Sequence, residues 1–151
     1  MTEPRTAADI LRFAIDREIE AARLYEDMAR RARNESSRTM LLGLAAEERE
    51  HRRRLEQWTA SPGAPWPEDA GRDLRITDSL PDEPWREDMP WADLLIYAAK
   101  KEARAMELYA RLASITSDPQ ARRLMELLAA QEKDHKRRLE KEYDDRVLAE
   151  N

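Results

Sequence analysis

The sequence predicts an all-α protein, an antiparallel four-helix bundle made of two repeated helical hairpins joined by a long crossover. Charged residues make up 39% of the 151 positions and Gly occupies only 3 of them, a composition typical of long, surface-charged helices. Apolar residues recur at spacings of three and four along four long stretches, as on one face of a helix. The second half of the chain also repeats the pattern of the first half 84 residues later. The length fits a single domain, residues 1–151.

The first predicted hairpin consists of helices at about 6–33 and 36–58. Thr6 precedes the first apolar stripe and is suited to cap that helix. A short polar break separates the two stripes, and Ser36 or Ser37 is the expected cap of the second helix. A connection this short places the two helices side by side and antiparallel.

The second predicted hairpin consists of helices at about 90–115 and 119–148. Pro90 is suited to the first turn of the first of these helices. Asp118 followed by Pro119 predicts the start of the other, as a cap followed by a first-position proline.

A crossover over about 59–89 links the two hairpins. It holds most of the 8 Pro residues and two of the 3 Gly residues, so we expect it to be mostly irregular. So long a connection is unusual in a small domain. We interpret it as carrying the chain from one end of the bundle to the other, with Trp66 and Trp85 as anchors.

Six ionisable residues interrupt the apolar faces of the four predicted helices. Each half contributes one Glu from its first helix and a Glu-x-x-His pair from its second. The two members of such a pair share one helix face, a turn apart. Neighbouring acids such as Glu47, Glu50 and Asp134 we interpret as solvated. The six residues are Glu18, Glu48, His51, Glu102, Glu132 and His135.

The six residues are also predicted to lie at one depth in the bundle. Glu18 lies 16 residues before Asn34, and Glu48 and His51 lie 14 and 17 residues after it. The second hairpin repeats these intervals around Asp118. With a rise of about 1.5 Å per residue, antiparallel packing of two such hairpins brings four carboxylates and two imidazoles into one layer of the core.

Such a layer predicts a site for two divalent metal ions. Burying this many ionisable groups is costly unless a counter-charge is present, and four carboxylates with two neutral imidazoles match the charge of two M²⁺ ions. The layer uses both His residues of the chain, and there is no Cys. The pattern is that of di-iron and di-manganese carboxylate bundles. Iron, manganese or a mixed pair remain open, because these ligands suit both metals.

Over nearly its whole length the sequence resembles the rubrerythrin branch of the ferritin-like superfamily. The resemblance implies a ferritin-like bundle with a non-haem di-iron centre that meets dioxygen or hydrogen peroxide. It also implies that Glu18 and Glu102 bridge the irons. The resemblance is carried by Glu18-x-x-Ala21-x-x-x-Tyr25, Glu102-x-x-Ala105-x-x-x-Tyr109, Glu48-Arg49-Glu50-His51 and Glu132-Lys133-Asp134-His135.

The resemblance places the remaining ligands and suggests further site residues. Glu48 and His51 belong to one iron, and Glu132 and His135 to the other. Tyr25 and Tyr109 lie two turns beyond Glu18 and Glu102. Because helical side chains lean towards the helix N-terminus, the two hydroxyls are placed to hydrogen-bond the site.

The expected function is that of a di-iron oxidoreductase, a peroxidase-type enzyme that reduces hydrogen peroxide or dioxygen in oxidative-stress defence or iron handling. A ferroxidase or iron-storage protein is the first alternative, and a metal-free helical interaction module is a weaker one. Rubrerythrins carry a Cys-rich rubredoxin domain and an extra carboxylate at the position of Ala105. This chain has neither feature, so we expect an external electron donor.

The charge and hydropathy of the sequence indicate neither a nucleic-acid nor a membrane partner. The net charge of −5 gives no indication of nucleic-acid binding. No apolar segment suggests membrane insertion or an N-terminal targeting sequence. The protein is therefore expected in the cytoplasm, with no membrane or nucleic-acid partner. A homodimer and exchange of hairpins between chains are left open.

Overall fold

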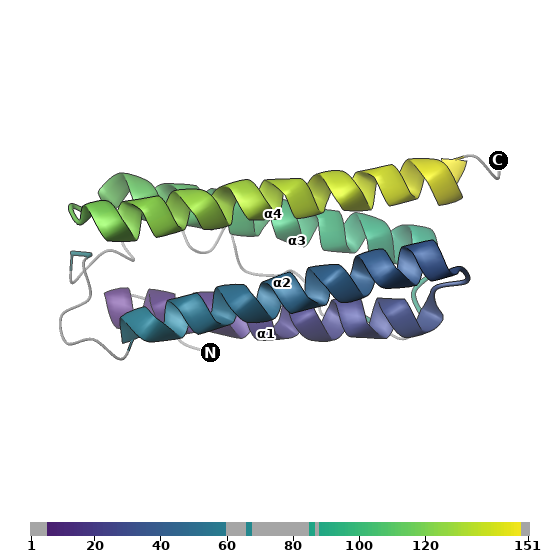
Figure 1. Ribbon diagram of the computed structural model, residues 1–151, viewed down its shortest axis with the longest axis horizontal. Coiled ribbons are helices and arrows are strands. Elements are labelled where there is room, and N and C mark those ends of the chain that lie inside the picture. Colours follow the sequence, from purple (N-terminus) through teal and green to yellow (C-terminus); the bar gives the residue numbers. More distant parts are fainter. Residues whose placement is uncertain (1–5, 60–65, 68–84, 87, 149–151) are drawn as a thin grey trace.

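The computed structural model describes residues 6–59, 66–67, 85–86 and 88–148, and within them the predicted all-α bundle is confirmed. Figure 1 shows two long helical hairpins lying against each other. Across the hairpins, α1 packs beside α3 and α2 beside α4. The elements are α1 (Ala7–Arg31), α2 (Glu35–Thr59), α3 (Trp91–Ile115) and α4 (Pro119–Arg146).

Two of the four predicted helix starts are confirmed by their caps. The Thr6 side chain accepts from the Asp9 backbone N–H, and the Asp9 carboxylate accepts from the Thr6 N–H, which forms a capping box at α1. At α4, the Asp118 side chain accepts from the Gln120 N–H, and Pro119 occupies the first turn. Both caps satisfy backbone donors that have no partner within the helix.

The other two starts differ from the prediction. Asn34, and not Ser36 or Ser37, caps α2, because its Oδ1 accepts from the Ser37 N–H at 2.8 Å. Pro90 is the cap residue of α3 and not part of its first turn, since its ψ of 150° is non-helical.

The core consists of two hydrophobic clusters with the polar layer between them. In α1, Leu11 and Ala14 belong to one cluster and Leu24 and Met28 to the other, and Glu18 lies between them in the sequence. Each fully buried Leu contributes roughly 1.5–3 kcal/mol. The two clusters therefore fix the helices above and below the layer and shield it from water.

The described part of the crossover confirms the two anchoring Trp side chains. Trp66 is buried, and its Nε1–H donates to the Leu112 carbonyl at 2.9 Å. Trp85 is half-buried against the second hydrophobic cluster. In Figure 1, α2 ends at the left end of the bundle and α3 begins at the right end, as predicted. The rest of the predicted crossover lies outside the described residues.

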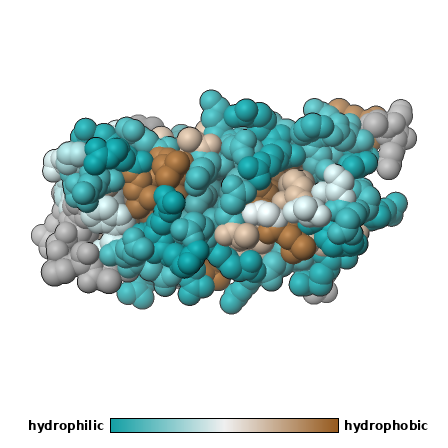
Figure 2. Space-filling model, viewed as in Figure 1, coloured by the Kyte–Doolittle hydropathy of each residue, from teal (hydrophilic) through white to brown (hydrophobic). Residues whose placement is uncertain are grey.

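The face seen in Figure 2 is mostly hydrophilic, with hydrophobic residues in small separate patches. This pattern follows from amphipathic helices whose apolar stripes face the core. Among the described residues, no helix combines the length and the apolar character needed to cross a bilayer.

Candidate metal centre

All four helices contribute to one buried cluster of carboxylates and imidazoles. The predicted convergence of the six ionisable residues is confirmed, and each is at most 2% exposed. Glu18 comes from α1 and Glu102 from α3, whereas α2 and α4 each supply a Glu-x-x-His pair. Ionisable groups this deeply buried are rare unless they are paired or hold a metal.

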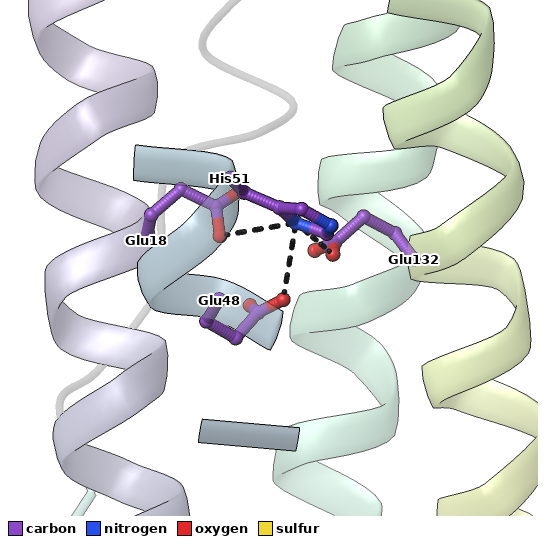
Figure 3. A group of neighbouring side chains, drawn as sticks. All are labelled: Glu18, Glu48, His51 and Glu132. Atoms are coloured by element: carbon purple, nitrogen blue, oxygen red, sulfur yellow. Dashed lines mark ion pairs between the residues drawn. The ribbon is translucent and has the colours of Figure 1, made fainter. Parts of the chain in front are cut away.

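The first half of the cluster is centred on His51 (Figure 3). Its Nδ1 lies 3.0 Å from Glu132 Oε1, 3.4 Å from Glu48 Oε1 and 3.6 Å from Glu18 Oε2. The ligand atoms of these four residues all lie within 4.8 Å of one another. Three oxygens and one nitrogen so arranged form a suitable donor set for a divalent transition metal.

The second half is centred on His135 and repeats this geometry. Its Nδ1 lies 3.0 Å from Glu48 Oε1, 3.4 Å from Glu132 Oε1 and 3.7 Å from Glu102 Oε2. The two imidazole rings are nearly parallel, with centroids 5.7 Å apart and an interplanar angle of 8°. The cluster thus has an approximate two-fold symmetry that follows the sequence repeat.

The carboxylates shared by the two halves are Glu48 and Glu132. Glu18 and Glu102, which the resemblance implies as bridges between the irons, each belong to one group only. The physical reason is the packing: α2 and α4 are neighbours across the hairpins, so the Glu of each Glu-x-x-His pair reaches both histidines. Glu18 and Glu102 each approach only one histidine.

The atoms that face one another in the cluster do not satisfy one another. Within the described residues, the buried side-chain nitrogens and oxygens that lack a hydrogen bond all belong to these six residues. They include both Nδ1 atoms and one oxygen from each carboxylate. Unsatisfied buried polar atoms are costly and uncommon. Their convergence fits a pair of metal ions.

Tyr25 and Tyr109 hydrogen-bond the cluster, as predicted, but across the hairpins. Tyr25 donates to Glu102 Oε1, and Tyr109 donates to Glu18 Oε1. Burial first, and then the nearby carboxylates, raise the pKa of both phenols well above 10.0. The two tyrosines therefore stay protonated and act as hydrogen-bond donors that orient the carboxylates of Glu102 and Glu18.

Two residues beside the histidines were not identified from the sequence. Gln131 Oε1 lies 2.6 Å from His51 Nε2, and Glu47 Oε2 lies 3.7 Å from His135 Nε2. Glu47, interpreted as solvated, is indeed 38% exposed, but it also accepts from Arg138 of α4 at 2.9 Å. The available signal was the repeat itself, because Glu47 and Gln131 occupy equivalent positions, one residue before Glu48 and Glu132.

Burial and mutual repulsion change the protonation of the cluster. Burial, followed by the charges of the other carboxylates, raises the pKa of Glu48 and Glu132 well above 4.5. Burial lowers the pKa of His51, but its contacts with Glu132 and Glu18 outweigh this and raise it to about 10. The metal-free cluster therefore holds protons, which a bound cation would displace.

The fold and the cluster together define a four-helix bundle with a carboxylate–histidine core site. The family profile of rubrerythrin matches residues 9–64 and 93–151, which include all six buried residues. The chain therefore belongs to the rubrerythrin family. No curated protein matches it.

Two solved structures share the fold. A hypothetical protein from Pyrococcus furiosus is 24% identical, with a TM-score of 0.70 over 91% of this chain and 87% of its own. A Thermotoga maritima protein, described as a candidate ferritin-like diiron-carboxylate protein, is 23% identical, with a TM-score of 0.71 over 97% of this chain and 99% of its own. At this identity the likeness shows the fold alone.

Proposed function

We propose that the protein binds two iron ions in this cluster and uses them to reduce hydrogen peroxide or dioxygen. The observation that carries the proposal is the set of unsatisfied atoms in two groups that share two carboxylates. Membership of the rubrerythrin family supports the same chemistry, as does the description of the Thermotoga protein.

Each of the two groups is proposed to hold one ion. Glu18 and His51 would bind only the first ion, and Glu102 and His135 only the second. This assignment agrees with the distances to the two Nδ1 atoms. The shared carboxylates supply the remaining donors of both groups. Four carboxylates and two neutral imidazoles balance the charge of two divalent ions.

The other residues of the site orient the ligands and exclude water. Tyr25 and Tyr109 hold one oxygen of Glu102 and Glu18, so that the other oxygen remains directed into the cluster. The hydrophobic clusters on either side keep the layer dry, which strengthens electrostatic interactions inside it. Ala105 is buried in one of these clusters. Its methyl group adds to the apolar surface around the site and provides no metal ligand.

The proposed redox chemistry needs two electrons per peroxide. When bound, a ferrous pair supplies them, so that H₂O₂ and two protons give two water molecules and each iron becomes ferric. Because these 151 residues include no Cys that could form a rubredoxin-type centre, the electrons that restore the ferrous state are proposed to come from outside them. The biological role would be defence against oxidative stress.

The test is anaerobic loading with Fe²⁺ followed by peroxide or air. We expect oxidation of two irons per chain with one equivalent of peroxide, followed by repeated turnover when a reductant is present. Accumulation of many ferric ions per chain as a mineral would instead indicate iron storage. Failure to bind iron would exclude both functions and favour a metal-free interaction module.

A further inference from the structure

The two-fold symmetry of the cluster is broken at the outer nitrogens of its two histidines. The inner donors are the same in both halves, but the residue beside each outer nitrogen differs. His51 Nε2 faces the side-chain amide of Gln131, whereas His135 Nε2 faces the carboxylate of Glu47. Gln131 and Glu47 are equivalent in the sequence repeat, and each lies on the helix opposite the histidine it faces.

The two contacts also differ in geometry. The His51 contact is a hydrogen bond of 2.6 Å to a neutral oxygen. The Nε2 of His135 is buried and lacks a hydrogen bond among the described residues, with Glu47 Oε2 at 3.7 Å. A shift of under about 1 Å brings that oxygen to hydrogen-bond distance. The Glu47 side chain is 38% exposed, so it has room to move.

A neighbouring arginine hydrogen-bonds Glu47 and keeps it close to His135. Arg138 donates to Glu47 at 2.9 Å and pairs with Asp134 at 2.6 Å. Its counterpart in the first hairpin, Arg54, contacts Glu50 at 3.5 Å, as Arg138 contacts Asp134. The arginine and its helical partner are thus present in both halves, and the difference arises from Glu47 against Gln131.

This difference has a predictable effect on the histidines as ligands. In each ring Nδ1 faces the cluster, so Nε2 carries the hydrogen in the neutral ligand form. A hydrogen bond from that N–H to a carboxylate makes the imidazole a stronger donor through its other nitrogen. An amide oxygen carries no charge and has a weaker effect. Arg138 reduces the charge of Glu47 but leaves a carboxylate acceptor in place.

We propose that the two metal positions are inequivalent, with the His135 position binding Fe²⁺ more tightly than the His51 position. Glu47 is the positioning residue that creates the difference. The inference rests on the proposed function, because it requires that the cluster hold two ions. Iron then enters in two steps, and the first ion occupies the position beside His135.

The test is anaerobic calorimetric titration of the full chain with Fe²⁺, comparing wild type with Glu47→Gln and Gln131→Glu. We expect two steps in wild type. Glu47→Gln should weaken the tighter step by about 10-fold and leave the other unchanged, and Gln131→Glu should tighten the weaker step. Glu50→Gln is the matched control, since it removes one charge from the same helix, and Glu50 pairs with arginines. It should leave both steps unchanged.

Mössbauer spectra of the ⁵⁷Fe²⁺-loaded proteins supply a readout that a merely structural role would not move. Two quadrupole doublets of equal area are expected for wild type, and a single merged doublet for Glu47→Gln.

Equal affinities with one doublet in wild type would overturn the inference while leaving the proposed function intact. So would an effect of Glu47→Gln on both steps alike or on neither. If Glu47→Gln does not fold, Gln131→Glu decides alone. Wild type that binds no Fe²⁺ overturns both the inference and the proposed function.

Discussion

At the scale of single residues, each ionisable group of the cluster would be costly to bury alone. Together, the four carboxylates and two imidazoles could match the charge of two divalent ions. Glu48 and Glu132 each contact both histidines, so neither can be removed without affecting both halves. The two tyrosines act through the carboxylates of Glu102 and Glu18, which they hydrogen-bond. The consequences of these contacts can be tested residue by residue.

Tyr109→Phe should weaken metal binding by about 10-fold, a typical cost for removing a group that orients a ligand. The substitution leaves the ring in place and removes only the hydroxyl that donates to Glu18. Anaerobic Fe²⁺ titration provides the measurement. Tyr143→Phe is a matched control, because Tyr143 is half-buried in α4 and packs against the core. Equal affinities of the two variants would rule out an orienting role for Tyr109.

The metal-free protein should lose stability as the pH rises. The pKa of His51 is raised from 6.5 to about 10 in the folded state, so its contribution is complete below pH 6.5 and is lost as the pH rises through 10. The raised pKa values of Glu48 and Glu132 act in the same direction above pH 4.5. Thermal unfolding in the presence of a chelator should therefore give a melting temperature that falls as the pH rises from 6.5 to about 10. A constant or rising melting temperature would contradict the protonation described above.

At the scale of the helices, the sequence repeat and the distances from the turns predicted which six side chains meet. They did not predict which carboxylates are shared, because that depends on α2 lying beside α4, and periodicity within one helix does not report its neighbours. The same limit applies to Tyr25 and Tyr109, whose partners lie on the opposite hairpin. The start of α2 was misplaced because Asn34, Ser36 and Ser37 all have the chemistry of a cap.

Trp66→Phe should destabilise the bundle by about 1–2 kcal/mol, because it removes the hydrogen bond to Leu112 and part of a buried ring. Denaturant unfolding at one pH, with chelator present, measures the change in free energy. Trp91→Phe serves as the control, since Trp91 is half-buried at the start of α3. A smaller loss is expected there. A loss for Trp66→Phe no greater than the control would show that Trp66 does not anchor the crossover.

At the scale of the whole molecule, two hairpins of similar sequence enclose one site that neither can form alone. Each proposed metal position draws on both hairpins, because Glu48 and Glu132 come from different halves of the chain. Ions that bind only the folded protein should therefore stabilise the packing of the hairpins against each other. The proposed metal binding would thereby be linked to the folding of the entire bundle.

Added metal should accordingly raise the melting temperature. A ligand at 100 times its dissociation constant stabilises the folded state by about 2.7 kcal/mol per site. Scanning calorimetry with Mn²⁺, which resists oxidation in air better than Fe²⁺, is a suitable measurement. Ca²⁺ is the control ion, because it binds oxygen ligands and disfavours imidazole. Identical melting curves with and without Mn²⁺ would argue against a site that holds this metal.

The most direct measurement is the metal content of the purified protein after anaerobic loading with Fe²⁺ and removal of free ions. Two irons per chain are expected for wild type, and fewer than two for Glu48→Ala and for His51→Ala. Glu50→Ala, from the same helix, should retain two. Two irons per chain in either Glu48→Ala or His51→Ala, or none in wild type, would contradict the assignment of this cluster as a two-metal site.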